Sequence, residues 1–129
     1  MGISVVDASA VAAVLFNEPE SDAVAERLGD DVLAAPALIA YELGNVCWKK
    51  STRHPQLAHL LRRTFDSFAE LGVRLHDVHG AEVLALASAR KITFYDASYL
   101  WLAMRLDVPL VTLDRRLSKA AQSRQPRMS

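Results

Sequence analysis

Cysteine is nearly absent from this sequence, because Cys47 is the only one among 129 residues. A single cysteine excludes an intrachain disulfide and a cysteine-rich zinc site. An excess of charge of one sign is absent as well, since 15 lysine and arginine residues balance 15 aspartate and glutamate residues. Any contact with nucleic acid must therefore come from a local basic patch and not from the charge of the whole chain.

Long apolar segments are also missing. The sequence has no apolar run of about 18 residues, the length that a membrane-spanning helix needs. Its N-terminus has neither the basic region nor the apolar region of a signal peptide. We therefore expect a cytoplasmic protein with no membrane contact.

No linker, repeat or low-complexity segment divides the chain. A length of 129 residues with 51% hydrophobic residues suits one domain with one core. We therefore predict a single domain over residues 1–129, in which the polar residues 122–129 form a loose tail.

Short apolar runs alternate with amphipathic segments along the chain. The apolar runs predict strands at residues 3–6, 32–35, 73–76 and 110–113. Helices are predicted at residues 8–16, 21–28, 37–50, 56–71, 81–90, 96–106 and 115–121, with a basic loop at residues 51–55. Strands separated by helices indicate an α/β fold, a three-layer α/β/α sandwich around a mostly parallel sheet.

Three aspartates stand where a predicted strand or connection leads into a helix. Asp7 directly follows the first strand, Asp114 directly follows the last one, and Asp96 opens the helix over residues 96–106. Each could simply cap its helix, because an N-cap aspartate accepts hydrogen bonds from free backbone N–H groups. The carboxyl ends of parallel strands nevertheless meet at one edge of a sheet, and open α/β sheets bind their ligands at this edge.

Glu42 is the fourth acid, and it lies within a predicted helix on an otherwise apolar face. A carboxylate on such a face is costly unless something pairs with it. A lysine or arginine could be the partner, but a metal ion shared with the three aspartates accounts for all four acids at once. Hard divalent cations such as Mg²⁺ prefer oxygen ligands and are often held by a few carboxylates together with substrate phosphate. The apolar residues on the face of Glu42 are Leu38, Ile39 and Val46.

Several segments resemble one protein family. They are residues 5–10 (VVDASA), 36–45 (PALIAYELGN), 95–100 (YDASYL) and 110–117 (LVTLDRRL), and the turn at residues 17–21 (NEPES) is similar too. With these segments in this order, the sequence resembles the PIN-domain ribonucleases, and within them the VapC toxins of bacterial toxin–antitoxin pairs. The resemblance covers nearly the whole chain.

This resemblance implies a PIN-like fold and an acidic site that is both catalytic and metal-binding. The implied site consists of Asp7, Glu42, Asp96 and Asp114, with Ser9 and Thr112 as polar supports. It also implies Mg²⁺ or alternatively Mn²⁺ as cofactor, an RNA substrate, a homodimer, and a VapB-like antitoxin that inserts a basic side chain among the acids. The sheet is expected to have four or five strands, because residues 124–128 match poorly the short apolar strand with which such toxins usually end.

The chemistry follows from the ligands. Metal ions held by carboxylates would polarise a phosphoryl oxygen, lower the pKa of a bound water and stabilise the leaving oxygen. The resemblance implies cleavage of single-stranded RNA, whereas four carboxylates alone would fit DNA equally well. Candidates for contact with phosphate are Lys49, Lys50, Arg53, Arg62, Arg63, Arg115 and Arg116. A merely solvated surface explains Arg62 and Arg63 equally well.

Two other functions compete with a ribonuclease. A phosphatase of the haloacid dehalogenase type would also place a nucleophilic aspartate at the end of its first strand. It would need a second acid two residues after Asp7, where this sequence has Ser9. A non-catalytic interaction module on a nuclease fold is the other alternative, and the intact set of costly acids argues against it.

Overall fold

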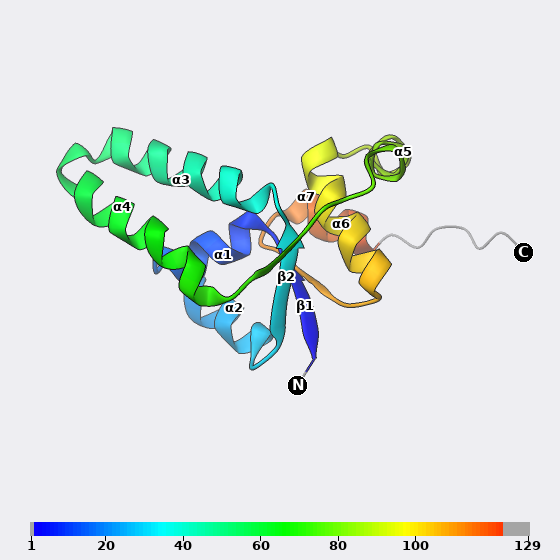
Figure 1. The fold of residues 1–129 in the computed structure, drawn as a ribbon, viewed down its shortest axis with the longest axis horizontal. Helices are drawn as coiled ribbons and strands as arrows, with labels where there is room; N and C mark the ends of the chain where they lie inside the picture. The colour runs from blue at the N-terminus through cyan, green and yellow to red at the C-terminus, as the bar shows by residue number, and fades with distance from the viewer. Residues whose placement is uncertain (1, 123–129) are drawn as a thin grey trace, which may run out of the picture.

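The structure is a computed structural model that describes residues 2–122, with a four-stranded sheet at its centre (Figure 1). The strands are β1 (Ile3–Val6), β2 (Val32–Pro36), β3 (Arg74–His76) and β4 (Leu110–Val111). They are ordered β3-β2-β1-β4, and every neighbouring pair is parallel. The predicted parallel sheet is confirmed.

Helices cover both faces of this sheet (Figure 1). One side carries α1 (Ala8–Leu15), α2 (Ser21–Leu28), α3 (Ile39–Arg53) and α4 (Ala58–Asp66). The other side carries α5 (Gly80–Arg90), α6 (Phe94–Leu106) and α7 (Arg115–Gln122). Two short 3₁₀ segments, η1 (Pro55–Leu57) and η2 (Ser67–Leu71), flank α4. The three-layer α/β/α sandwich is therefore confirmed.

The order of the strands reverses at β1, which places a crevice outside the carboxyl ends of β1 and β4. The chain runs outward from β1 through β2 to β3, and then returns across the sheet to place β4 on the other side of β1. Because connections between parallel strands are right-handed, this reversal puts α5 and α6 on the face opposite to α1 and α3. The point of reversal at the carboxyl ends of β1 and β4 is where such folds bind their ligands.

The core is built around β1, the central strand. Val5 and Val6 are fully buried, as expected for a parallel sheet that is covered on both faces. Small side chains such as Ala10 and Ala13, both fully buried, let α1 approach the sheet closely. On the opposite face α6 contacts β1, β2 and β4, and its Tyr99 is almost completely buried. The carboxyl end of β1 is thus held rigidly between two layers of helices.

Some boundaries differ from the prediction. The basic loop predicted after residue 50 is wrong, because α3 continues through Arg53, and the Thr52 hydroxyl donates to the Trp48 carbonyl within it. The helix predicted at residues 56–71 is α-helical only in α4, where 3₁₀ turns begin and end it. The last strand ends at Val111, because β1, the strand with which it pairs, ends opposite it at Val6.

Gln122 is the last residue of α7 and does not belong to a tail. The rest of the predicted tail and the strand considered at residues 124–128 lie outside the described residues. No helix in the described part of the chain is long and apolar enough to cross a membrane.

Candidate active site

The four predicted acids each stand at the start of a different helix. Asp7 is the N-cap of α1, Glu42 lies in the first turn of α3, and Asp96 lies in the first turn of α6. Asp114 directly precedes α7, where its Oδ1 accepts a hydrogen bond from the Leu117 N–H at 2.9 Å. Because a helix N-terminus carries partial positive charge, this placement partly offsets the repulsion among the carboxylates.

Two of these positions refine the sequence prediction. Asp96 does not cap α6, since the N-cap is Thr93, whose hydroxyl accepts a hydrogen bond from the Asp96 N–H at 3.0 Å. Glu42 does not lie in the middle of its helix, because α3 begins only at Ile39. A simple capping role therefore explains Asp7 and Asp114 in part, but not Asp96 or Glu42.

Asp7 is the most firmly held of the four acids. Its Oδ2 accepts a hydrogen bond from the Thr112 hydroxyl at 2.6 Å, and its Oδ1 accepts from the Ser9 hydroxyl at 2.7 Å. The backbone N–H of Ala10 also donates to Oδ1, at 3.0 Å. Asp7 is only 5% exposed, so these bonds fix the direction of its carboxylate.

The two hydroxyls that hold Asp7 also tie β1 to the segment after β4. The Thr112 hydroxyl accepts a hydrogen bond from the Asp114 N–H at 3.0 Å, and the Ser9 hydroxyl accepts one from the Leu113 N–H at 2.9 Å. Asp7 and Asp114 are therefore positioned by one shared network. In this network Ser9 and Thr112 each donate a hydrogen bond to Asp7 and accept one from the backbone after β4.

Glu42 has an uncharged partner. The Tyr99 hydroxyl donates a hydrogen bond to the Glu42 Oε1 at 2.5 Å, which connects α6 to α3. Burial raises the pKa of Tyr99, and the Glu42 carboxylate raises it further, so the phenol keeps its proton. We did not predict Tyr99 as a site residue. Its position three residues after Asp96, on the same face of the helix, is the signal that could have indicated it.

The fold disfavours the ionised forms of three of the acids. Burial raises the pKa of Asp7 above its usual value and the charge of Asp114 adds to this, against the opposing hydrogen bonds led by that of Thr112. Burial likewise raises the pKa of Glu42, with added repulsion from Asp96 and Asp7. The pKa of Asp96 is raised by burial and by the charges of Asp114 and Asp7. The acids are thus close enough to act on one another electrostatically.

The donors suit a hard divalent cation. All four side chains offer carboxylate oxygens, which Mg²⁺ and Mn²⁺ prefer, and a cation would relieve the repulsion that adds to burial in raising the pKa values of Asp7, Glu42 and Asp96. Within residues 2–122, no three histidine, cysteine or acidic side chains are already drawn together into a geometry that could hold an ion. A bound cation would therefore have to pull the carboxylates closer together.

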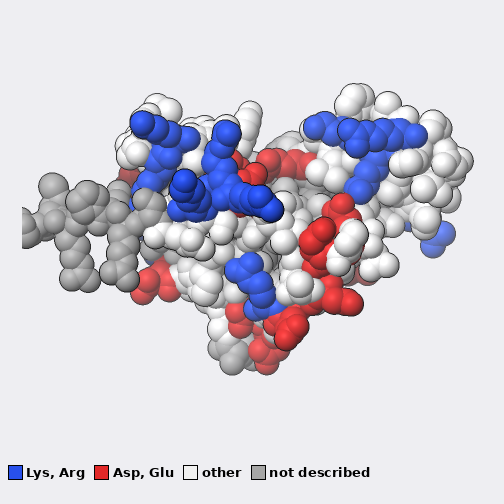
Figure 2. All heavy atoms as spheres, turned by 180° about the vertical axis from the view of Figure 1, so that it is seen from behind, with Lys and Arg blue, Asp and Glu red and all other residues white. Residues whose placement is uncertain are grey.

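Basic side chains gather on both sides of the crevice. Figure 2 shows one group of lysines and arginines over the end of the molecule that contains α5 and α7, another over α3, and acidic side chains in the hollow between them. Arg116 acts on the site directly, because its charge lowers the pKa of Asp96 against the larger effect of burial. Arg116 also lines a cavity of about 320 Å³ with three further cations, Arg90, Lys91 and Lys119.

The other predicted phosphate contacts have varied surroundings. Lys50 forms an ion pair with Glu18 at 3.5 Å and lies over the Phe16 ring, so part of its role is to hold α3 against the turn after α1. Lys49 is exposed beside the site, and Arg53 ends α3. Arg115, Arg62 and Arg63 are exposed as well.

Comparison with known proteins identifies the fold family. Residues 4–123 match the PIN domain. The chain belongs to the PIN domain family. The crystal structure of PAE2754 from Pyrobaculum aerophilum has the same fold as this PIN domain, with a TM-score of 0.76 and 32% sequence identity over 95% of this chain and 89% of that one.

Relatives of this PIN domain carry the VapC name. Ribonuclease VapC3 of Pyrobaculum aerophilum is 35% identical over 121 residues, which cover 89% of this chain and 92% of that protein. Ribonuclease VapC9 of Mycobacterium tuberculosis is 31% identical over 122 residues, covering 95% of this chain and 94% of that protein. The chain is therefore a PIN domain of the VapC type.

The Thr112 hydroxyl allows a direct test of the network around Asp7. We expect Thr112→Val to lower the free energy of unfolding by about 1–3 kcal/mol, because the Asp114 N–H and Asp7 each lose a hydrogen-bond partner. It should also raise the pKa of Asp7 further, since the Thr112 bond opposes the effect of burial. Denaturant unfolding and an NMR titration of the carboxyl groups measure the two effects.

Thr52→Val provides the matched control, because the Thr52 hydroxyl bonds only to a carbonyl within an exposed stretch of α3. If Thr112→Val and Thr52→Val unfold at the same denaturant concentration, the network does not support Asp7 in the way described.

Proposed function

We propose that this VapC-type PIN domain is a metal-dependent endoribonuclease that acts as the toxin of a toxin–antitoxin pair and cleaves single-stranded RNA. The supporting observation is that four carboxylates stand at the starts of helices around the switch point of the sheet and act on one another electrostatically, three of them with raised pKa values. Relatives at 35% and 31% identity are named ribonucleases. Four acids that repel one another are costly to the fold, and binding of a cation gives them a function.

In this proposal Asp7, Glu42, Asp96 and Asp114 hold Mg²⁺, which Mn²⁺ can replace. When bound, the ion would supply a Lewis acid that polarises a phosphoryl oxygen and lowers the pKa of a water molecule, the source of the nucleophile. Ser9 and Thr112 keep the Asp7 carboxylate in one orientation. The Tyr99 hydroxyl does the same for Glu42, so the donors need little reorganisation during the reaction.

The basic side chains around the crevice would bind the RNA backbone. The chain has no net charge, so affinity for a polyanion must come from the groups of cations on either side of the acids. Arg116 and Lys49 lie close to the acids, since Arg116 lowers the pKa of Asp96 and Lys49 lines the same cavity as Glu42. Lys50, Arg53 and Arg115 would extend this contact along α3 and α7.

The test is an assay of the purified protein on single-stranded RNA and on DNA of the same sequence. We expect cleavage of the RNA with Mg²⁺ or Mn²⁺, and no cleavage when a chelator is present. Undiminished cleavage in the chelator would exclude the metal mechanism. Equal cleavage of the DNA would exclude the assignment to RNA.

The same assay tests the proposed antitoxin. A carboxylate cluster is a natural receptor for a cation, so we propose that a VapB-like protein inserts a basic side chain among the four acids and covers the RNA entrance. Adding the product of a neighbouring reading frame should then stop cleavage. A protein that purifies alone and keeps its activity in the presence of that product would contradict this.

We also propose that the protein is a homodimer. Exposed apolar side chains on α5 and α6, Leu84 and Met104, are 59% and 49% accessible in the single chain and would be covered by a second copy. Light scattering of the purified protein measures its mass, and a monomer at micromolar concentration would count against the dimer.

A further inference from the structure

A cavity of about 620 Å³ opens beside three of the four acids. Segments that carry three of the acids also form its walls: Ala8 follows Asp7, Tyr95 precedes Asp96, and Glu42 itself lines it. Its volume lies within the range of pockets that bind small organic groups. The cavity is therefore next to the reaction site and large enough for a nucleobase with its sugar.

Two exposed aromatic rings from different helices face this cavity. Tyr41 of α3 is 82% exposed and Tyr95 of α6 is 62% exposed, although both line the cavity. Neither ring contributes to the buried core. A flat aromatic face with no partner beside a phosphodiester-cleaving site is suited to stacking on a base, since every base presents a π-face.

The rest of the lining matches the other parts of a nucleotide. Leu38 and Val46 provide an apolar wall. Tyr41, Asn45 and Lys49 follow one another at intervals of four residues and so form one stripe along α3. An asparagine amide can donate to and accept from the edge of a base, and a lysine at the outer end can contact the phosphate of the next nucleotide.

We propose that this cavity is a subsite for one unpaired nucleobase of the substrate, adjacent to the phosphate that is cleaved, an inference that rests on the proposed ribonuclease function. The base stacks on Tyr95 and Tyr41, its edge faces Asn45, and Lys49 contacts the neighbouring phosphate. A base inside a duplex is already stacked and paired, so only a single strand can fill this subsite. Asn45 and Lys49 suit a base with its phosphate better than an apolar side chain of a protein.

Equilibrium binding of a labelled single-stranded RNA oligonucleotide, measured by fluorescence anisotropy in chelator, tests the subsite. We expect Tyr95→Ala and Tyr41→Ala each to raise the Kd by about 5- to 150-fold, the range for loss of one base–aromatic stack. Tyr95→Phe keeps the ring and should bind within about twofold of the wild type. Thermal melting confirms that each variant is folded.

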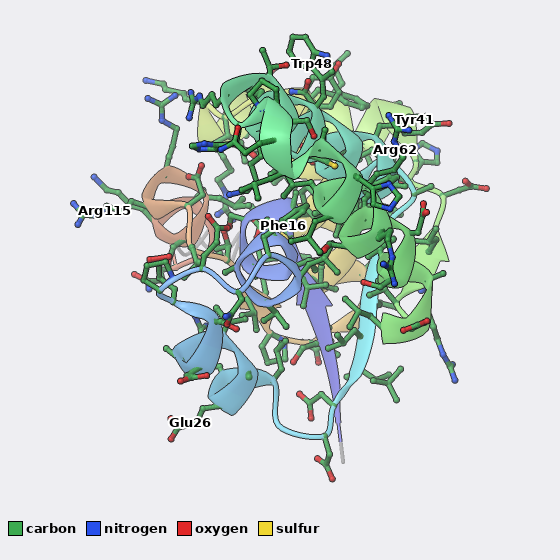
Figure 3. All side chains as sticks on the ribbon, turned by 90° about the vertical axis from the view of Figure 1, so that its left-hand side faces the viewer. Phe16, Glu26, Tyr41, Trp48, Arg62 and Arg115 are labelled. Carbon is green, nitrogen blue, oxygen red and sulfur yellow. The ribbon has the colours of Figure 1, made fainter. Side chains whose placement is uncertain are left out.

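Trp48→Ala is the matched control. Trp48 is also on α3 and 63% exposed, but it does not line the cavity, and Figure 3 shows it apart from Tyr41. Its replacement should leave the Kd unchanged. A loss of affinity as large as that of Tyr41→Ala would overturn the subsite, because exposed aromatic rings would then contribute regardless of position.

A series of oligonucleotides, each with one abasic position, locates the base that binds in the cavity. At one position, removal of the base should weaken RNA binding by the wild type. With that oligonucleotide, Tyr95→Ala should cause no additional loss of affinity, because the base that stacks on Tyr95 is already missing. If Tyr95→Ala raises the Kd by the same factor with every oligonucleotide, Tyr95 does not stack on a base and the proposal fails.

These outcomes are separable from failure of the proposed function, since binding in chelator needs no catalysis. A protein that binds RNA with the predicted dependence on Tyr95 but cleaves none would overturn the ribonuclease and leave the base subsite supported. A protein that cleaves RNA while Tyr95→Ala and Tyr41→Ala change no Kd would overturn the subsite alone. Variants that bind RNA normally but escape inhibition by a protein partner would also overturn it, and would assign the cavity to that partner.

Discussion

Asp7→Asn should lower the rate of metal-dependent RNA cleavage by at least about 100-fold, the usual scale for loss of one key electrostatic contact in a catalytic site. Asp7 is the centre of the site, because it accepts hydrogen bonds from Ser9, Ala10 and Thr112 and its charge acts on Glu42 and Asp96. Asparagine removes the charge but keeps an oxygen for the Ala10 N–H, so α1 stays capped. Steady-state cleavage of a defined RNA measures the effect.

Asp7→Ala should be equally inactive but less stable. Alanine removes the N-cap of α1 as well as the charge, and a lost cap costs about 0.5–2 kcal/mol. Comparing the two variants therefore separates loss of the site from loss of the fold.

Asp31→Asn is the matched control for the charge. The Asp31 carboxylate also accepts hydrogen bonds from a hydroxyl and a backbone N–H, those of Ser4 and Gly2, but it lies at the other end of β1. Its replacement should leave cleavage unchanged. Activity of Asp7→Asn close to that of Asp31→Asn would exclude Asp7 from the catalytic machinery.

Asp96→Asn should be inactive, yet more stable than the wild type when no metal is bound. The raised pKa of Asp96 shows that the fold disfavours its charge, so a neutral amide of the same size relieves both burial and repulsion. Solvent partly screens this half-buried group, and we expect a gain of roughly 0.5–2 kcal/mol, the common scale for relief of a strained functional site. The cap of α6 is unaffected, because Thr93 accepts from the backbone N–H of residue 96.

The stability of the metal-free protein should depend on pH for the same reason. Asp7, Glu42 and Asp96 all have pKa values raised by folding, so the native state binds more protons than the unfolded chain. Metal-free wild type should therefore gain stability as the pH falls through the folded pKa values, and lose it as the pH rises through them. This dependence should be weaker in Asp96→Asn. Mg²⁺ at neutral pH should stabilise the wild type by binding to the folded state.

Thermal melts with Mg²⁺ and with chelator measure these differences, and Asp22→Asn gives the control. Asp22 also lies in the first turn of a helix, α2, but it is exposed and is not among the charges that affect the pKa values of Asp7, Glu42 and Asp96. Its replacement should destabilise slightly, by about 0.3–1 kcal/mol, because an acid favours the positive end of a helix. If Asp96→Asn shifts stability in the same direction as Asp22→Asn, the four acids do not repel one another as described.

The main outline of the site could be predicted because it depends on local patterns. Asp7 and Asp114 directly follow apolar strands, and parallel strands bring their carboxyl ends to one edge whatever the details of packing. Glu42 was conspicuous because a carboxylate conflicts with the apolar face around it. Asp96 stood out because it follows a connection into a predicted helix, and the family resemblance then supplied the supporting roles of Ser9 and Thr112.

What could not be predicted depends on contacts between distant segments. The partner of Glu42 was expected to be a cation or a metal ion, but Tyr99, 57 positions away, already donates a hydrogen bond to it. A buried tyrosine looks like an ordinary core residue in sequence, and only the packing of α6 against β1 and β2 brings it to Glu42. Similarly, β4 ends at Val111 because its partner β1 ends opposite it at Val6, which the apolar sequence of residues 110–113 does not reveal.

The pairing of β1 with β4 determines when during synthesis the site can form. A ribosome produces β1 at the start and β4 near the end, and domains generally fold as units as the chain emerges. Asp7 and its hydrogen-bond partner Thr112 are 105 positions apart, so a nascent chain has Asp7 long before the residue that orients it. Incomplete chains that stop before β4 would lack both Thr112 and Asp114. The proposed activity would thus belong to chains that include β4, and fragments released from the ribosome before β4 would lack it.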